Sequence, residues 1–246
     1  MNFFDKISKN RQNLNENEGK ILDYFFSNTD KIEKLTIREV CKDNYIVPNT
    51  LIRFCKKLGF SGYSEFKTTF KLSVNTTLIS DEKTSLDKQV LKTKEILNLE
   101  TIDSIVTSIY NAKKIIILSF GLSRNVANDL NEHLQMIGLN SHTYIDTNVI
   151  EYNCSLLNKD DVLICFSISG ETKKVLESIN IAKTKGARTV SITEFSSNTL
   201  SKLSDFQLYA MISKKSLNGI DLTSRIGFFY ISNLIFERYF EKYFVV

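Results

Sequence analysis

Hydrophobic residues follow two different spacings along the chain, and the change between them divides it near residue 80. Before that point apolar side chains recur every three or four positions, which predicts amphipathic helices. After it, helical stretches alternate with short continuous apolar runs, typical of strands buried on both faces of a sheet. The pattern predicts an all-α domain at 1–74, a linker at 75–85, and an α/β domain at 86–246 with a parallel sheet flanked by helices.

The first domain carries the local signals of a helix-turn-helix. A helix is predicted over 15–27, and Thr36 with Glu39 forms a capping box at the start of a second, short helix. Pro48 suits the first position of the next helix, and Gly59 suits the position just after its end. A short helix, a tight connection and a second helix are what a helix-turn-helix requires.

The second helix of that motif is rich in polar and basic side chains. Most charged runs on helices only solvate an outer face, so the distribution of charge along the chain bears on the interpretation. Residues 1–80 contain 13 Lys+Arg and 9 Asp+Glu, whereas 81–246 contain 19 of each. The positive excess therefore lies in the first third, which favours binding of a polyanion such as DNA. The candidate DNA contacts are Asn49, Thr50, Arg53, Lys56 and Lys57.

A strand, a small-residue turn and a helix follow one another in the second domain. The apolar run at 162–166 leads into Ser-x-Ser-Gly-x-Thr at 167–172, and a helical pattern then continues to a stop at Gly186. Hydroxyls and the free N–H groups of a helix start can hold an anion, with Gly170 allowing close approach and Glu171 turned outward in the first helical turn. A serine-rich turn that only caps the helix is the alternative.

A second turn of this kind strengthens the case for an anion site. The strand at 115–118 runs into Ser-Phe-Gly-Leu-Ser at 119–123, and another amphipathic helix follows. Parallel strands end at one edge of a sheet, where open α/β folds bind ligands. Further strands are predicted at 141–145, 189–193 and 206–211. The candidate phosphate-binding residues are Ser123, Ser167, Ser169 and Thr172.

Two resemblances to known families cover nearly the whole chain. Residues 102–209, with Gly-Leu-Ser at 121–123 and Ser-Ile-Ser-Gly-Glu-Thr at 167–172, resemble the sugar isomerase (SIS) domain, a phosphosugar-binding fold. Residues 14–72, with RFCKKLGFSGYSEFK at 53–67 as the signature, resemble the RpiR-type bacterial transcriptional regulators. The chain departs from these families at Ser119, where glycine is usual, and at Val47, where a capping serine is common.

The resemblance implies a DNA-binding regulator of sugar metabolism, whose SIS domain binds a phosphorylated sugar and thereby modulates operator binding. In that family the four hydroxyl residues would hold the phosphate. The alternative is an enzyme, either a phosphosugar isomerase or a deaminating relative, which needs an acid and a base. The two histidines, His133 and His142, belong to no recognisable acid–base pair, and no cluster has metal-ligand spacing. We therefore predict no catalysis, no metal and no cofactor.

The remaining features concern location and assembly. Residues 1–6 contain an acid and no apolar core, so no signal peptide is predicted, and no apolar run is long enough to span a membrane. The four cysteines show no close pairing, as in reduced cytoplasmic proteins. Residues 224–240 form a helix that is apolar around most of its circumference. Burial within the domain or a homodimer interface, or one in a higher homo-oligomer, would cover it.

Overall fold

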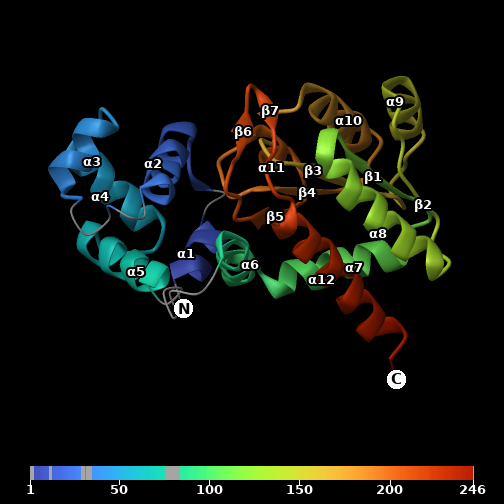
Figure 1. The fold of residues 1–246 in the computed structure, drawn as a ribbon, viewed down its shortest axis with the longest axis horizontal. Helices are drawn as coiled ribbons and strands as arrows, with labels where there is room; N and C mark the ends of the chain where they lie inside the picture. The colour runs from blue at the N-terminus through green and yellow to red at the C-terminus, as the bar shows by residue number, and fades with distance from the viewer. Residues whose placement is uncertain (1–2, 11–12, 29–30, 32–34, 76–83, 246) are drawn as a thin grey trace. The chain divides into compact units, whose positions relative to one another are not determined.

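Two structural units make up the computed structural model, Met1–Thr84 and Ser85–Val246. It describes residues 3–10, 13–28, 31, 35–75 and 84–245 (Figure 1). Most of the predicted linker, 75–85, lies outside the described residues, so the predicted domain boundaries stay a prediction.

Helices form the first unit around a core of phenylalanines. In order they are α1 (Phe3–Asn10), α2 (Glu16–Ser27), α3 (Ile37–Asp43), α4 (Pro48–Lys57) and α5 (Tyr63–Asn75). Phe25, Phe54 and Phe66 are fully buried, and the ring centroids of Phe25 and Phe66 lie 4.8 Å apart. Helix α1, which was not predicted, adds a buried Phe3 to this cluster, 5.0 Å from the ring of Phe70.

The second unit is built on a parallel five-stranded sheet in the order β2-β1-β3-β4-β5. Its strands are β1 (Ile115–Ser119), β2 (Ser141–His142), β3 (Val162–Ser167), β4 (Arg188–Glu194) and β5 (Phe206–Ala210). The predicted α/β fold class is confirmed. The strand predicted at 141–145 is shorter, because the chain turns away after His142 and Asp146 caps the next helix.

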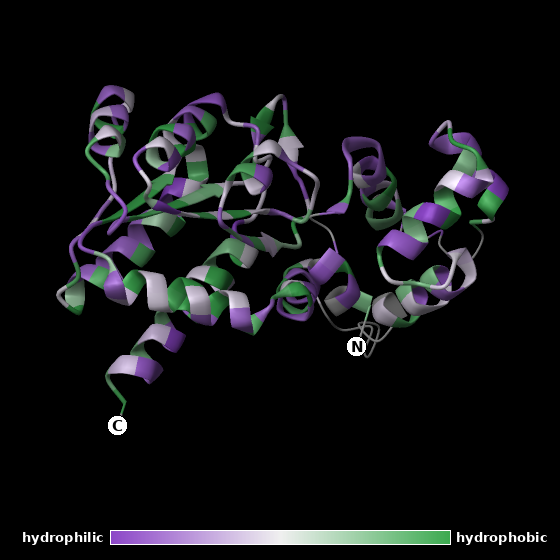
Figure 2. Cartoon of the chain, turned by 180° about the vertical axis from the view of Figure 1, so that it is seen from behind, coloured by the Kyte–Doolittle hydropathy of each residue, from purple (hydrophilic) through white to green (hydrophobic). Residues whose placement is uncertain are grey.

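Helices cover both faces of this sheet (Figure 1). One face packs on α7 (Leu99–Asn111), α8 (Arg124–Met136) and α12 (Ile226–Tyr243). The other packs on α9 (Thr147–Ser155), α10 (Lys173–Thr184) and α11 (Thr199–Leu203). Alternate side chains of β1 enter the two cores, Ile115 and Ile117 one, Ile116 and Leu118 the other. Strands β1 and β3 are accordingly hydrophobic along most of their length (Figure 2).

Two further pieces complete the unit at the end of β5. Helix α6 (Ser85–Ile96) is joined to the chain after β5 by the Thr93 hydroxyl, which accepts a hydrogen bond of 3.0 Å from the Met211 amide. The chain then forms an antiparallel hairpin of β6 (Ser216–Leu217) and β7 (Ile220–Asp221) before α12 begins. The hairpin and α9 were not predicted.

The four cysteines are free, and all four are buried. Burial raises the pKa of the Cys55 thiol to about 12 and that of Cys154 to about 11. These thiols therefore stay protonated at neutral pH and act as small apolar side chains, Cys55 in the helical unit and Cys154 in the core between the sheet and α9 and α10.

Candidate functional site

Helix α4 is positioned by a short capped helix and by its own apolar face. The Thr36 side chain accepts from the Glu39 amide, and Glu39 accepts from the Thr36 amide, which completes the predicted capping box of α3. Leu51 and Phe54 anchor α4 in the phenylalanine core. Its N-cap, Val47, makes no side-chain hydrogen bond, Pro48 has no N–H, and the Thr50 amide donates to the Val47 carbonyl, so the Asn49 N–H is the one that this helix start offers to a phosphate.

The predicted DNA contacts divide into two groups on α4. Asn49, Arg53 and Lys56 are exposed and share one face, because they are four and three positions apart. Thr50 is half-buried beside them. Lys57 instead faces α2, where its ammonium lies 2.7 Å from a carboxylate oxygen of Glu18.

Tyr45 is a surface feature of this motif that sequence reasoning missed. It lies in the turn between α3 and α4, has a φ of 53°, and is 96% exposed. A hollow of about 430 Å³ separates it from α2 and is bordered by Thr50 and Arg53. A large amphipathic side chain beside the exposed face of α4 enlarges the surface that a nucleic acid could contact.

The turn after β3 brings two of the predicted phosphate-binding hydroxyls together. The oxygens of Ser167 and Thr172 lie 3.2 Å apart, and the Gly170 amide donates to Ser167 Oγ over 3.2 Å. Ser169 is exposed, and its hydroxyl accepts from the Glu171 amide over 3.2 Å. Thr172 is the N-cap of α10 but makes no side-chain capping bond, so N–H groups at the start of α10 are open to an anion.

Gly170 and Glu171 have a different role from the predicted one. Gly170 has a φ of 64°, and a Cβ built on it would lie 2.1 Å from Asn198 Oδ1, so its close neighbour is Asn198 and not a ligand. Helix α10 begins only at Lys173, so Glu171 lies before its first turn. The Glu171 carboxylate accepts from the Thr199 amide at the start of α11, 2.7 Å away. Together they fasten the turn to α11.

Ser123 lies in the turn after β1, at the same carboxyl edge of the sheet as the turn after β3. Ser119, the departure from glycine, is buried in the strand and donates to the Phe166 carbonyl over 3.1 Å. A short 3-10 helix, η4 (Gly121–Ser123), then leads into α8, whose N-cap Ser123 makes no side-chain capping bond. Ser123 is buried, and its hydroxyl accepts from Arg225 Nε over 3.2 Å.

Arg225 was missed by sequence reasoning. It immediately precedes α12, and its side chain is 9% exposed. The segment was interpreted only as an apolar helix, since nothing local to Ser224-Arg225 shows that Ser123, 102 positions away, is its neighbour. The only sequence signal was a basic residue at the border of a strongly apolar run.

The sheet order explains why these turns share one edge. In the order β2-β1-β3-β4-β5 the connections from β1 and β3 leave in opposite directions, so the switch point lies between these two strands. Ser119 is paired with Phe166, so both turns begin at the same level of the sheet. The hydroxyls of these turns and the starts of α8 and α10 therefore lie at one edge of the sheet, where open α/β folds bind ligands.

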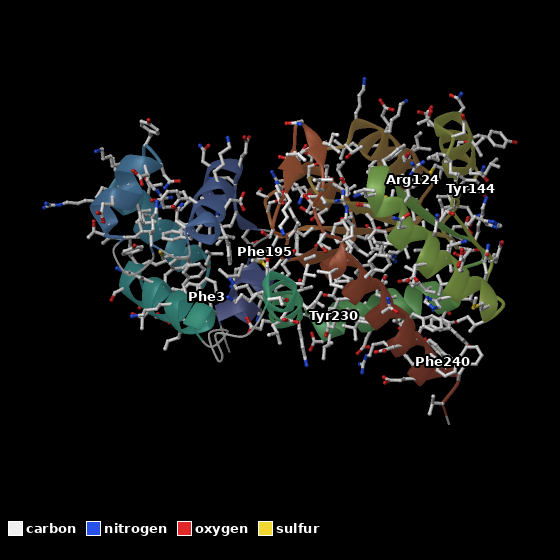
Figure 3. All side chains as sticks on the ribbon, viewed as in Figure 1. Phe3, Arg124, Tyr144, Phe195, Tyr230 and Phe240 are labelled. Atoms are coloured by element: carbon white, nitrogen blue, oxygen red, sulfur yellow. The ribbon has the colours of Figure 1, made fainter. Side chains whose placement is uncertain are left out.

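A second hollow, of about 470 Å³, adjoins the turn after β1. Leu122, Arg124, Asn125 and Ile145 are among the residues that line it. Arg124 lies at the start of α8 (Figure 3) and is exposed. The hollow offers a guanidinium and amide groups beside an apolar wall, a composition that can hold a polar organic molecule.

The two histidines lie away from this edge. Helix α8 starts at the carboxyl edge of the sheet, and His133 is in its last turn, where its ring stacks on Phe236 at 4.8 Å. His142 is level with Ile116, three residues before the end of β1, and contacts Asn140. Among the described residues, no group of three or more His, Cys, Asp or Glu side chains could hold a metal ion, and no helix could cross a membrane.

Comparison with known proteins agrees with the geometry. Residues 1–77 match the family model "Helix-turn-helix domain, rpiR family", and residues 108–232 match that of the SIS domain. A Clostridium perfringens protein named an uncharacterized HTH-type transcriptional regulator is 27% identical, over 99% of this chain and 94% of its own length.

Solved structures share the fold. The NanR protein of Vibrio vulnificus, in complex with ManNAc-6P, has a TM-score of 0.62 at 22% identity and covers 98% of this chain and 92% of its own. The sugar isomerase domain of an RpiR transcription factor from Sphaerobacter thermophilus has a TM-score of 0.58 at 19% identity, over 64% of this chain and 86% of its own. With both family models matched in order, this chain belongs to the RpiR family of helix-turn-helix transcriptional regulators that carry a SIS domain.

Proposed function

We propose that this protein is a cytoplasmic regulator of sugar metabolism that binds operator DNA through α4 and a phosphorylated sugar at the β1/β3 edge of its SIS domain. The observation that carries the proposal is the convergence at this edge of the Ser167 and Thr172 hydroxyls with the uncapped start of α10. A phosphate ester is the ligand class whose charge and acceptor oxygens suit such a set of donors. The complex of NanR with ManNAc-6P supports this class of ligand.

A thermal-shift screen against phosphorylated sugars, each paired with its unphosphorylated form, tests the ligand class. A ligand that binds only the folded state stabilises it by about 2.7 kcal/mol when present at 100 times its Kd. We expect at least one phosphorylated sugar to raise the melting temperature, and its unphosphorylated partner to leave it unchanged. Stabilisation by both members of a pair alike would contradict phosphate recognition at this edge.

We propose that the protein only binds its ligand and does not convert it. Isomerisation requires a group that moves a proton between carbon atoms and usually an acid that opens the ring. His133 is fixed on Phe236 and His142 contacts Asn140, both below the carboxyl edge. The remaining carboxylate of the turn, Glu171, is held by the Thr199 amide. Proton NMR of the protein with aldose and ketose phosphates would reveal interconversion, and turnover that Ser169→Ala abolishes would establish the enzyme alternative.

The predicted DNA contacts differ in their expected contribution to binding. Lys56 is exposed, whereas Lys57 is paired with Glu18, so Lys56 is the better phosphate contact. We expect Lys56→Ala to lower the slope of log K against log salt by about 1, as loss of one phosphate contact does. We expect Lys57→Ala to have a smaller effect.

Fluorescence anisotropy with operator DNA at several salt concentrations measures both slopes. Lys202→Ala, on α11 of the SIS domain, is the matched control and should keep the wild-type slope. An unaltered slope for Lys56→Ala would remove Lys56 from the list of phosphate contacts.

We propose that the protein forms a homodimer through the outer face of α12. The inner face of this helix is buried in its own domain, with Phe228 and Ile231 fully covered. Phe236 packs on the core of the domain and stacks on His133, and the rings of Phe240 and Phe244 follow it toward the end of α12, with successive centroids 6.2 and 5.3 Å apart. Phe240 (labelled in Figure 3) is 41% exposed and Phe244 50%. Exposed aromatic area of this kind favours self-association, which analytical ultracentrifugation measures directly.

A further inference from the structure

Arg225 is the cation that the fold places against the proposed phosphate site. Its Nε donates to Ser123 Oγ over 3.2 Å, its Nη1 donates to the Thr223 carbonyl, and its Nη2 lies 2.5 Å from a carboxylate oxygen of Asp221. Its side chain is only 9% exposed, whereas that of Asp221 is 52% exposed. The guanidinium is therefore largely buried in the protein, and its acidic partner, Asp221, is exposed to solvent.

Other cations near this edge are engaged elsewhere or point outward. Lys214 lies 2.7 Å from Glu194, and Lys173 lies 3.8 Å from Glu177 one turn along α10. Arg124 is exposed at the start of α8. Arg225 by contrast bonds directly to one of the hydroxyls predicted to hold phosphate. A guanidinium presents several donors in a planar fork, which matches the geometry of phosphate oxygens.

Asp221 satisfies part of this guanidinium. Hydrogen bonds from Arg225 and Thr223 hold the pKa of the Asp221 carboxyl well below its usual range, so the group is a carboxylate at neutral pH. Its second oxygen accepts from the Thr223 amide over 2.9 Å. An anion of the protein's own thus occupies the donors that an anionic ligand would use.

The Asp221 carboxylate also links an exposed hairpin to Arg225. Asp221 is the last residue of β7, which pairs with β6 through a turn at Asn218 and Gly219, both with positive φ. Leu217 and Ile220 in this hairpin are 61% and 65% exposed. The hairpin has few buried contacts of its own, so its attachment to Arg225 contributes a large part of its ordering.

We infer that Arg225 binds the phosphate group of the ligand, that Asp221 competes with this phosphate for the guanidinium, and that ligand entry releases the β6–β7 hairpin. The inference rests on the proposed function, because it places the phosphate at the β1/β3 edge. It assigns the site a charged residue and gives ligand occupancy a structural consequence.

Inorganic phosphate is the probe for the test, with isothermal titration calorimetry on the full chain at constant ionic strength. Asp221→Asn removes the competing charge but keeps an oxygen for the Thr223 amide, and we expect it to bind phosphate about tenfold more tightly. Arg225→Gln should bind it about 10- to 100-fold more weakly, as expected for loss of hydrogen bonds to a charged group. Asp160→Asn is the matched control, since it removes a carboxylate that pairs with Lys113 before the start of β3, at the opposite end of the strand, and it should change the affinity less than twofold.

Hydrogen exchange supplies a second readout in the wild-type protein. Saturating phosphate should accelerate exchange of the Thr223 amide, which Asp221 now holds, and of the Leu222 amide, which donates to the Lys215 carbonyl over 2.8 Å. Asp221→Asn lacks the ion pair with Arg225, so the Leu222 amide of this variant should exchange faster than that of the wild type even without phosphate. Slower exchange in the wild type on addition of phosphate would overturn the release of the hairpin.

The outcomes separate this inference from the proposed function. If Ser169→Ala and Thr172→Val weaken phosphate binding while Asp221→Asn and Arg225→Gln leave it unchanged, the phosphate site stands and the role of Arg225 is wrong. If none of the four variants alters phosphate affinity, both fail. If Asp221→Asn binds phosphate no more tightly than the wild type, Asp221 does not compete with phosphate for Arg225. If neither the wild type nor Asp221→Asn binds phosphate detectably, the inference as a whole is wrong.

Discussion

Replacement of Gly170 by alanine should destabilise the SIS domain by about 2–4 kcal/mol, a loss in the upper range for single substitutions. Two effects add at this position. A left-handed backbone costs a residue with a Cβ about 1 kcal/mol or more, and Gly170 has a φ of 64°. In addition, the new Cβ would lie 2.1 Å from Asn198 Oδ1 and 2.7 Å from Asn198 Cβ, so Asn198 must move.

Asn198 cannot move without a loss of stability, because it is buried and both polar atoms of its side chain make hydrogen bonds. Its Oδ1 caps α11 by accepting from the Ser201 amide over 2.9 Å, and its Nδ2 donates to Thr193 Oγ1 over 3.0 Å. Loss of an N-cap costs about 1 kcal/mol, and an unpaired buried polar group costs a further 1–3 kcal/mol.

Hydrogen exchange of the slowest amides in β3 and β4 measures this loss within the SIS domain itself. Gly138→Ala is the matched control, because Gly138 has a φ of 83° and nothing within 4 Å of a built Cβ. The control should cost only the backbone component, about 1–2 kcal/mol. Equal losses in the two variants would show that Asn198 yields without cost and would contradict the packing argument.

The parts of the fold that could be predicted from sequence are those specified by neighbouring residues. The capping box of Thr36 and Glu39, and Pro48 at the first position of α4, are local signals, so the helix-turn-helix was found. The buried strands could be predicted because a parallel sheet covered on both sides requires continuous apolar runs. The Asn218-Gly219 turn was also a local signal for a hairpin, and it was overlooked.

The parts that could not be predicted depend on residues far apart in the sequence. Glu171 is exposed, as expected, but its bond to the start of α11, 28 positions along the chain, was not expected. Arg225 reaches Ser123 only because β5 and the hairpin after it return the chain to the edge where β1 ends. Lys57 could not be distinguished from Lys56 without α2, which supplies Glu18. Spacing identifies the hydroxyls of the site, whereas the tertiary fold decides which charges surround them.

Ser169→Ala should separate sugar sensing from DNA binding. Ser169 is exposed, and its hydroxyl accepts only from the neighbouring Glu171 amide among the bonds described, so its removal should leave the fold intact. A hydrogen bond from a hydroxyl to a phosphate dianion contributes about 1.5–3 kcal/mol. The affinity for the sugar phosphate should therefore fall about tenfold or more, while the affinity for operator without ligand stays unchanged.

The ligand response of the variant follows from linkage. A ligand shifts operator binding only by its differential affinity for the two arrangements of the protein, commonly about 1–3 kcal/mol or a 5- to 150-fold change. Ser169→Ala weakens binding to both arrangements alike if the hydroxyl contacts phosphate in each of them. The midpoint of the response should then move to about tenfold higher ligand concentration, and its amplitude at saturation should be kept.

Fluorescence anisotropy of operator DNA, titrated with the sugar phosphate that gives the largest thermal shift, records midpoint and amplitude together. Ser155→Ala is the matched control, because its hydroxyl donates to the Tyr152 carbonyl on α9. An unshifted midpoint in Ser169→Ala would remove Ser169 from the phosphate site. A wild-type protein whose operator affinity does not respond to saturating ligand would disprove the coupling itself, since the sugar phosphate would then bind both arrangements equally well.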